Sequence, residues 1–385
     1  MGDLADVRDG THDSPKYYLT GYPLVTSKNL TDAGLDMSNV SLISAEDFER
    51  INKRSKVDIG DIIFGMIGTI GNPVLVDRCD FAIKNVALIK NSENIQNSLL
   101  LQLLKSPIFR KYVQNENVGN TQKFLGLNKI RDYNFLIPAS TEQIVIGNFF
   151  RALDDTITLH QRKLDGLKEL KRGYLQQLFP QTGECVPRVR FDGFSEPWQE
   201  RKLDEVAEFS KGNGYSKSDL IDKGTPIILY GRLYTNYETV IKNVNTFTKM
   251  KANSILSQGG EVIVPSSGET AEDISCASVV GDEGVILGSD LNIIMPDSKI
   301  HSTFLAIAIS NGTQQKELSK RAQGKSIVHI SNSDLKEVVL QFPSLPEQTA
   351  ISNFFRTFDG QIAAQEQKLS YLKQLKSAYL QKMLV

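Results

Sequence analysis

Few residue patterns in this chain have the types and spacing that chemistry requires. Gly65-Met-Ile-Gly68-Thr-Ile-Gly71 follows a stretch of strand character, as a phosphate-binding loop would. It lacks the lysine and the hydroxyl residue of a P-loop, and its spacing is not the dinucleotide-binding fingerprint. We therefore interpret it as a hairpin turn. Asn72-Pro73 is followed by Val-Leu instead of an aromatic pair, which matches the catalytic loop of an amino-methyltransferase poorly.

Metal-binding and acid–base patterns are equally weak. The histidines have no ligand spacing and stand at His12, His160, His301 and His329. The cysteines also lie far apart, at Cys79, Cys185 and Cys276. Their odd number and wide separation favour reduced thiols in a cytoplasmic protein over a disulfide framework or a zinc site. No carboxylate spacing identifies a nuclease site, although distant carboxylates can still meet in space. The sequence therefore points to no catalytic residue and no metal ligand.

Two polar loops have the residue types that bind nucleic acid. One spans residues 117–124, ahead of the last strand that we expect in the first globular region, and the other spans 321–327 at the same place in the second. Amide side chains read base edges, whereas lysine and hydroxyl groups reach phosphates. The candidate DNA-binding residues in these loops are Asn120, Thr121, Gln122, Lys123, Gln323, Lys325 and Ser326. A polar surface loop without such a role is the open alternative.

Basic residues beside tyrosines form further surfaces of the same character. They occur at the start of the chain and in the segment between residues 215 and 234. A cation next to an aromatic ring can contact both a phosphate and a base. We add four residues to the candidate DNA contacts: Lys16, Lys217, Arg232 and Tyr234.

The elements that must position these residues include one long segment that is present twice. Residues 142–179 and 347–384 align without a gap at an offset of 205, and about half of the aligned positions are identical. Repeat proteins have periods of about 20–50 residues, so this repeat is on the scale of a domain. We infer that the unit is a globular domain plus a long helix, used twice. The chain should then be pseudo-twofold symmetric and present two similar surfaces at a fixed distance.

Both copies of this segment have the apolar spacing of a coiled coil. The first copy places apolar residues at Ile146, Phe150, Leu153, Ile157, Leu164, Leu167, Tyr174 and Leu178. The second copy places them at Ile351, Phe355, Phe358, Ile362, Leu369, Leu372, Tyr379 and Met383. Polar residues interrupt both copies at matching sites, which are His160 and Lys171, then Gln365 and Lys376. One such stripe alone would fit an ordinary helix bundle, but two of them predict antiparallel pairing within the chain.

Ahead of each helix lies a globular region of mixed character. Strands are expected over 58–64, 74–76, 85–89 and 260–264, and helices over 98–115, with a possible break at Pro107, and over 302–321. The predicted fold class is α+β, with two globular target domains joined by two long helices in an intramolecular coiled coil. The expected divisions are 1–140, first globular domain; 141–180, first spacer helix; 181–197, linker; 198–345, second globular domain; and 346–385, second spacer helix.

Composition excludes some classes of protein. The chain has 385 residues, of which 40% are hydrophobic and 23% charged, and a formal net charge of −1. This balance argues against an acidic DNA mimic and against a basic histone-like protein. No stretch is long and apolar enough to cross a bilayer, and the N-terminus lacks the pattern of a signal peptide. We expect a cytoplasmic protein without a membrane partner.

Several of these segments together resemble the specificity subunit of type I restriction–modification systems. The resemblance rests on the Pro-x-x-x-Glu-Gln pattern at the start of both helices, at Pro138 and Pro343, on the Tyr-Leu-Gln pattern near their ends, at Tyr174 and Tyr379, and on two further stretches, 9–15 and 191–203. It covers nearly the whole chain. One departure is that nothing ahead of Gly2 matches Trp198-Gln-Glu-Arg-Lys-Leu203. The first domain is therefore expected to lack that entry segment, through either a truncated chain or an alternative start.

The resemblance implies a function in recognition. Each globular domain would read one half of a bipartite, asymmetric target in double-stranded DNA, and the helices would space the half-sites and dock two methyltransferase subunits. The chain itself would catalyse nothing and hold no cofactor. S-adenosylmethionine, ATP and Mg²⁺ would be bound by partner subunits, which include restriction subunits where these are present. Two rivals remain: a nucleic-acid enzyme with unrecognised catalytic residues, and a coiled-coil scaffold that does not bind DNA.

Overall fold

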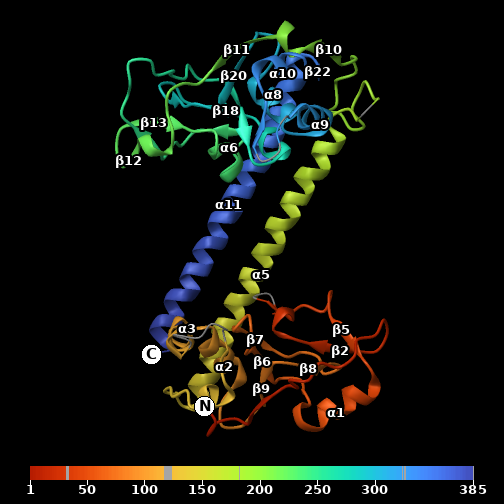
Figure 1. The fold of residues 1–385 in the computed structure, drawn as a ribbon, viewed down its shortest axis with the longest axis vertical. Helices are drawn as coiled ribbons and strands as arrows, with labels where there is room; N and C mark the ends of the chain where they lie inside the picture. Colours follow the sequence, from red (N-terminus) through yellow and green to blue (C-terminus); the bar gives the residue numbers. More distant parts are fainter. Residues whose placement is uncertain (32–33, 117–123, 182, 323, 325–326, 385) are drawn as a thin grey trace. The chain divides into compact units, whose positions relative to one another are not determined.

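The computed structural model describes residues 1–31, 34–116, 124–181, 183–322, 324 and 327–384. The chain divides into two compact units, one formed by Met1–Lys163 with Gln365–Val385 and the other by Leu164–Ala364. Each unit contains one globular domain together with part of each long helix, α5 (Ser140–Gln177) and α11 (Leu345–Met383) (Figure 1). The predicted α+β class and the two spacer helices are confirmed.

An antiparallel four-stranded sheet forms the centre of the first globular domain. Its order is β1 (Val7–Asp9), β9 (Val86–Ile89), β6 (Ile62–Gly65) and β7 (Gly71–Leu75). Successive side chains of a strand point to opposite faces, and here both faces are covered. Ile62 and Phe64 pack in a core with helix α2 (Asn97–Lys105), whereas Ile63 packs in a second core with a smaller sheet. The smaller sheet has the order β5 (Ser41–Ile43), β2 (Tyr22–Val25), β8 (Ala82–Ile83).

The second domain repeats this plan and adds strands. Its main sheet has the order β11 (Ala207–Lys211), β20 (Leu291–Pro296), β16 (Val262–Pro265), β18 (Ser278–Val280), β14 (Val240–Ile241). The smaller sheet has the order β12 (Leu220–Ile221), β15 (Phe247–Thr248), β13 (Thr225–Ile228), β19 (Ile286–Leu287). Helix α8 (Ser302–Ile309) takes the place that α2 has in the first domain. The two domains therefore have cores of the same design and differ at the sheet edges. Among the described residues, β14 has no counterpart in the main sheet of the first domain.

Shorter elements complete the two domains. In the first unit they are β3 (Leu30–Thr31), β4 (Gly34–Leu35), α1 (Ala45–Ser55), α3 (Pro107–Glu116) and α4 (Leu127–Arg131). In the second they are α6 (Arg232–Thr235), β17 (Ser267–Gly268), α7 (Ala271–Ile274), α9 (Gly312–Arg321), β21 (Val328–His329) and α10 (Asn332–Lys336). The expected break at Pro107 is confirmed, because α2 ends at Lys105 and α3 begins at that proline. The glycine-rich stretch after β6 connects it to β7 as a hairpin, as predicted.

One sequence-based expectation is wrong. In the second unit β10 (Gln199–Lys202) pairs antiparallel with β22 (Val339–Phe342), which is the last strand of that domain. A last strand was also expected in the first domain, after the loop at residues 117–124, but residues 125–139 form none. The physical reason is the absence of a partner: no strand among the described residues offers its backbone groups to this segment, and a lone strand gains no ladder hydrogen bonds.

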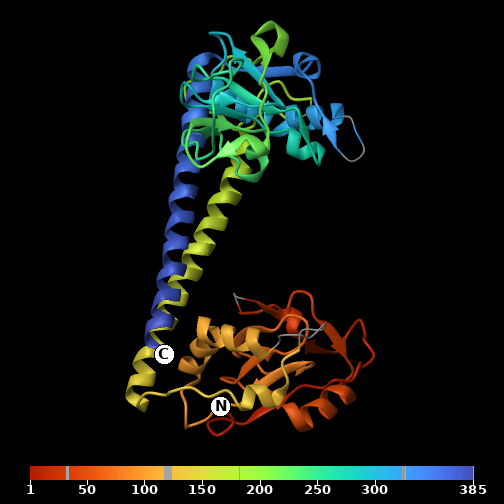
Figure 2. The same cartoon turned by 60° about the vertical axis from the view of Figure 1, so that its left-hand side comes forward.

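The two long helices pair in both units, and Figure 2 shows them from a second side. In the first unit the ring of Phe149 lies 5.2 Å from that of Tyr379. In the second unit the ring of Tyr174 lies 5.0 Å from that of Phe354. Partner numbers fall along α11 as they rise along α5, so the pairing is antiparallel, as predicted. Tyr174 and Tyr379 are equivalent in the internal repeat, and so are Phe149 and Phe354. Each unit therefore contains the same aromatic contact, in which the tyrosine comes from α11 in the first unit and from α5 in the second.

The polar interruptions of the two stripes bond to each other across the helices. Lys376 Nζ donates to Asp154 Oδ1 at 2.5 Å in the first unit, and Lys171 Nζ donates to Asp359 Oδ1 at 2.5 Å in the second. Asp154 and Asp359 are equivalent in the repeat, and so are the two lysines. Equivalent ion pairs therefore occur in both units. Both lysines lie mostly below the surface, where an unpaired charge would be costly.

The remaining two interruptions form a hydrogen bond of their own. Gln365 Nε2 donates to the backbone oxygen of His160 at 2.9 Å and lies 2.6 Å from His160 Nδ1. These two residues are separated by 205 positions, which is the offset of the repeat. Apolar residues of the seam are buried around such pairs, including Leu164, Leu369 and Leu372. Phe150 and Phe355 instead lie within the cores of the two globular domains.

Candidate nucleic-acid interface

A glycine ends the first strand of each globular domain and starts a loop. A Cβ atom on Gly10 would lie 2.3 Å from the carbonyl oxygen of Ile83, and one on Gly212 would lie 1.9 Å from that of Gly288. Only glycine fits so close to a neighbouring strand. The chain then leaves the sheet in loops that return at β2 and at β12. Lys16 and Lys217 are exposed in these equivalent loops.

A histidine is held by two side chains at the base of the first loop. His12 Nε2 lies 2.9 Å from Asp9 Oδ2, and His12 Nδ1 lies 2.8 Å from Asn85 Oδ1. Hydrogen bonds accepted by Asn85 first, and then by Asp9, raise the pKa of His12 above its ordinary value, because both favour the ring that carries two protons. Arg54 Nη2 donates to the other oxygen of Asp9. Asn85 has φ of 56°, a conformation that asparagine tolerates well. The base of the loop is thus tied together by hydrogen bonds and an ion pair.

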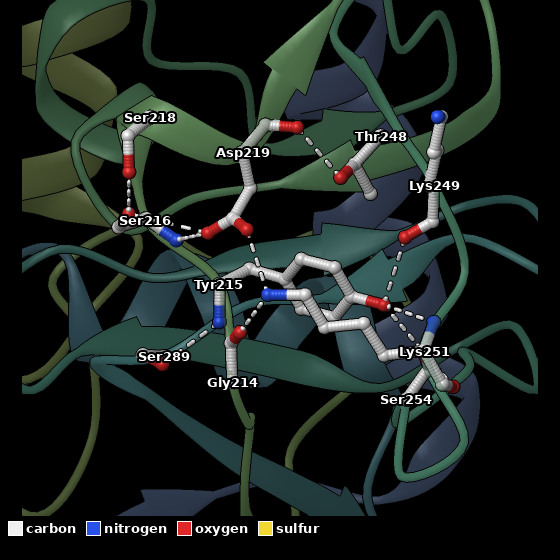
Figure 3. Close-up of polar contacts among 10 residues, drawn as sticks. All are labelled: Gly214, Tyr215, Ser216, Ser218, Asp219, Thr248, Lys249, Lys251, Ser254 and Ser289. Carbon is white, nitrogen blue, oxygen red and sulfur yellow. Dashed lines mark hydrogen bonds and ion pairs between the residues drawn. The ribbon is translucent and has the colours of Figure 1, made fainter.

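The loop after Gly212 is fixed by a buried tyrosine (Figure 3). The hydroxyl of Tyr215 accepts a hydrogen bond from the backbone nitrogen of Lys251 at 2.7 Å and lies against Ser254 Oγ. Lys251 Nζ lies 4.4 Å from the centre of the Tyr215 ring and donates to Asp219 Oδ1 at 2.7 Å. That hydrogen bond lowers the pKa of Asp219 below its ordinary value, and the backbone N–H of Ser216 adds to the effect. Tyr215 therefore joins the loop after Gly212 to the loop that contains Lys251. Lys217, two residues further along, is exposed on the first of these loops.

Arg232 and Tyr234 lie in α6, beyond the other end of β13. The Arg232 guanidinium is mostly buried and donates to Glu238 Oε2 at 2.6 Å, to the Asn243 backbone oxygen at 3.1 Å and to Asn245 Oδ1 at 3.2 Å. These bonds make it a support of the following loop. The Tyr234 ring lies 6.2 Å from that of Tyr230. Contact of either residue with DNA stays a prediction.

The two polar loops singled out in the sequence lie outside the described residues. This applies to Asn120, Thr121, Gln122 and Lys123 of the first loop, and to Gln323, Lys325 and Ser326 of the second. Their role in base reading stays a prediction. Their flanks are placed: Phe124 bridges to Ile67 after the first loop, and the second loop leads into β21, which pairs with β17.

Three residues of these clusters escaped the sequence analysis. Arg54, Asn85 and Lys251 come from segments remote from the loops that they support, and they meet those loops only in the folded domain: Arg54 lies in α1, Asn85 between β8 and β9, and Lys251 after β15. One local signal existed for Asn85: an asparagine between β8 and β9 is typical of a tight turn with positive φ. Nothing in the local sequence of Arg54 or Lys251 sets them apart from other basic residues.

The described residues contain no group of three or more histidine, cysteine, aspartate or glutamate side chains placed to hold a metal ion. Within the same part of the chain, no helix is both long enough and apolar enough to span a membrane.

Known proteins with similar sequences have one common description. The family model described as the type I restriction modification DNA specificity domain matches residues 1–169 and 195–374. The type I restriction enzyme MjaVIII specificity subunit of Methanocaldococcus jannaschii is 19% identical over 365 residues, which are 92% of this chain and 83% of that protein. The putative MjaX specificity subunit of the same organism is 20% identical over 391 residues, covering 97% and 88% of the two chains.

Solved structures show the same fold. The S subunit of a type I restriction–modification system from M. genitalium has a TM-score of 0.64 at 15% identity, with 100% of this chain and 94% of that chain covered. A chain from a study of complex assembly and conformational transition in a type I R-M system has a TM-score of 0.56 at 17% identity, covering 99% and 95%. Because the family model matches both globular domains and most of both helices, this chain belongs to the type I restriction modification DNA specificity domain family, as a DNA sequence-recognition subunit.

Proposed function

We propose that each globular domain reads one half of a bipartite, asymmetric DNA target. The observation that carries this proposal is the pair of equivalent glycine turns, at Gly10 and Gly212, followed by loops of unlike sequence. The cores and helices repeat, while the loops that project from them differ. Two unlike readers on a common frame suit a target whose halves differ, just as identical readers suit a palindrome. A scaffold without a DNA role has no need for this difference.

The long helices have two proposed tasks: to set the gap between the half-sites and to dock methyltransferase subunits. Leu159, Leu170 and Tyr371 are large apolar side chains that lie exposed on the helices, away from the seam. A docked methyltransferase subunit would cover these side chains. The repeat supplies two similar surfaces, which suits two methyltransferase subunits. Restriction subunits would join the complex where the host makes them.

The chemistry is assigned to the partners. S-adenosylmethionine would be bound by the methyltransferase subunits, and ATP and Mg²⁺ by the restriction subunits. This chain would supply recognition to a site-specific adenine methyltransferase and nuclease complex. The rival proposal of a fused enzyme would be revived if the purified chain alone transferred labelled methyl groups to DNA.

The test is methylome sequencing of a methylation-deficient host that expresses this chain with its methyltransferase subunit. We expect methyladenine at one asymmetric, split motif. A second strain carries the head of a related subunit in place of residues 1–140, and half of the motif should then change while the other half stays. Methylation of an unchanged motif by the exchanged chain would show that this domain does not read DNA. A complex that assembles but methylates no split motif would favour the scaffold.

A further inference from the structure

A short turn follows β15 in the second domain and projects from its smaller sheet. It spans residues 251–254, and the backbone nitrogen of Ser254 donates to the backbone oxygen of Lys251 at 3.1 Å. Ala252 and Asn253 are the two central residues of this turn, and both are exposed. Because a β-turn reverses the chain at its two central residues, these two form its tip.

A buried tyrosine fixes this turn from inside the domain (Figure 3). Tyr215 is only 4% exposed, so its ring cannot contact another macromolecule. Its hydroxyl accepts from the backbone nitrogen of Lys251 at 2.7 Å and donates to the backbone oxygen of Lys249 at 3.3 Å. Ser254 Oγ donates to the backbone oxygen of Lys251 at 2.8 Å. The turn is therefore formed before any ligand arrives, which lowers the entropy cost of binding one.

Two further hydrogen bonds join the turn to the loop that follows β11. Asn213 Nδ2 donates to the backbone oxygen of Asn253 at 3.3 Å. Lys251 Nζ donates to the backbone oxygen of Gly214 at 2.8 Å. Lys217, a candidate DNA contact, is exposed on that loop. The turn and the loop therefore form one continuous surface of the second domain.

Two polar side chains of this surface have no partner within the described part of the chain. They are the exposed amide of Asn253 and the exposed ammonium of Lys249, each of which uses only its backbone oxygen in a hydrogen bond. In Figure 3 the Lys249 ammonium points away from Tyr215. An asparagine amide can accept from N6 of adenine while it donates to N7, and an ammonium attracts phosphate. The surface thus offers one group for a base edge and one for the DNA backbone.

The first domain has a different element at the equivalent place. β5 pairs antiparallel with β2, as β15 pairs with β13, but helix α1 follows β5 where the turn follows β15. Each element is attached to the first loop of its domain in the same way. Arg50 Nη1 of α1 donates to Asp13 Oδ2 at 3.2 Å, and Lys251 Nζ of the turn donates to Asp219 Oδ1 at 2.7 Å. The attachment is common and the attached element differs, as expected of elements that read unlike half-sites.

We propose that the turn of residues 251–254 reads an adenine in the half-site of the second domain. The Asn253 amide pairs with N6 and N7 of that adenine in the major groove, and the Lys249 ammonium contacts a phosphate beside it. Tyr215 is a positioning residue, which holds the turn and touches no DNA. This inference rests on the proposed function, because it takes the second domain to read one half of the target, and it adds the residues and the base.

The test uses the complex of the full chain with its methyltransferase subunit, and the target found by methylome sequencing. Asn253→Ala should relax the requirement for one adenine in the half of the motif that exchange of residues 1–140 leaves unchanged. Duplexes with 7-deazaadenine at one adenine at a time locate the position, because this base lacks the N7 acceptor. At that position the unaltered complex should bind the 7-deazaadenine duplex at least about fivefold more weakly than the normal duplex. The Asn253→Ala complex should bind the two duplexes equally.

Lys249→Ala separates phosphate contact from base reading. It should weaken binding of all duplexes alike and reduce the slope of log affinity against log salt by about 0.9, the value for one phosphate. Lys299→Ala is the matched control, because Lys299 is also well exposed and lies past Pro296, at the opposite end of the main sheet from the loop after β11. Its removal should leave the slope unchanged.

The positioning role of Tyr215 is tested with Tyr215→Phe, which keeps the buried ring and removes the hydroxyl. This change should lower the affinity of the unaltered complex for the normal duplex. It should lower the affinity much less when Asn253 is already alanine, because the two residues act through one contact. Equal losses in the two backgrounds would show that Tyr215 does not act through Asn253.

The outcomes distinguish this inference from the proposed function. If exchange of residues 1–140 changes half of the motif but Asn253→Ala leaves every base requirement intact, the inference is wrong and the proposed function stands. If the exchange changes nothing, the proposed function fails and the inference fails with it. Weaker binding by Asn253→Ala without any change in base requirement also overturns the pairing with adenine. Because Asn253 and Lys249 are exposed, their replacement should not prevent folding, which circular dichroism checks.

Discussion

At the scale of residues, His12 is the group whose protonation the structure predicts. Its two ring nitrogens face oxygen atoms of Asp9 and Asn85, so the doubly protonated ring is favoured and the pKa is raised. His301 provides the opposite case, because burial and nearby Arg356 lower its pKa. We expect an NMR titration to place the midpoint of His12 above 6.5 and that of His301 below it. His12→Asn and His301→Asn assign the two signals.

The sign of the pH effect follows from the raised value. The interactions of His12 stabilise the first loop fully below the pKa of the unfolded chain and are lost as pH rises through the folded pKa. Hydrogen exchange of residues 10–18 should therefore speed up relative to the rest of the chain as pH rises through that range, once corrected for intrinsic rates. A His12 midpoint below that of His301 would contradict the hydrogen bonds to Asp9 and Asn85.

Sequence analysis finds candidate DNA-binding residues where the local residue pattern alone identifies them. Lys16 and Lys217 were singled out beside tyrosines and lie exposed in equivalent loops. Arg232 was singled out on the same grounds, yet its guanidinium is largely buried among acceptors of its own chain. Arg54, Asn85 and Lys251 could not be found, because only the folded domain brings them to their loops from distant segments.

At the scale of elements, the paired helices depend on two partly buried ion pairs. Removing one partner leaves a charge without compensation, so we expect Lys376→Met to destabilise the first unit by about 1–2 kcal/mol. For a domain of about 150–250 residues this corresponds to a fall in Tm of roughly 2–8 °C. Thermal unfolding followed by circular dichroism measures the effect.

Helix α5 offers an exposed ion pair as a control. Arg172 and Glu169 form an ion pair at 2.5 Å in which both side chains are well exposed, so Arg172→Ala should change the Tm very little. The exchanged pair Asp154→Lys with Lys376→Asp should recover part of the loss caused by either single change. An Arg172→Ala variant as unstable as Lys376→Met would show that burial does not govern these pairs.

Helices and strands were predicted correctly where the apolar pattern in the sequence is long. The prediction failed where a strand needs a second strand to pair with. The repeated apolar stripe predicted both long helices, their antiparallel pairing and the sites of their polar interruptions. The break at Pro107 followed from the chemistry of proline. Residues 134–137 have strand-like composition and still form no strand, because a strand exists only when a partner satisfies its backbone. Sequence composition indicates the conformational preference of a segment, but it does not show whether a partner strand is present.

At the scale of the whole molecule, the proposed ruler can be lengthened without disturbing either unit. Four residues inserted between Lys163 and Leu164, together with four between Ala364 and Gln365, fall at the division of the chain into its two units. The contacts within each unit are then kept. Four helical residues add about 6 Å, so the gap in the methylated motif should grow by about one to two base pairs at roughly 3.4 Å each.

The matching control inserts four residues into α5 alone, which shifts the two helices out of register and should impair methylation. Methylome sequencing reads the gap in each case. A complex with both insertions that still methylates at the original gap would show that the helices do not set it.

The charge balance leads to a separate prediction about affinity. With a net charge of −1, the chain has no excess of positive charge to attract the DNA phosphates, whose contacts dominate binding affinity. We expect weak binding of a cognate duplex by the isolated chain, and tight binding that falls steeply with salt in the complex with methyltransferase subunits. Titrations at two salt concentrations distinguish the two states. Equal affinities for the isolated chain and the complex would refute the prediction.

The hydrogen bond between His160 and Gln365 has a consequence for assembly from halves. Two identical half-length chains, paired about a twofold axis, must meet at their midpoint with the same residue on both sides. Joining the halves in one chain removes that constraint, and here an imidazole lies opposite an amide. A homodimer of either half alone could not reproduce this pair.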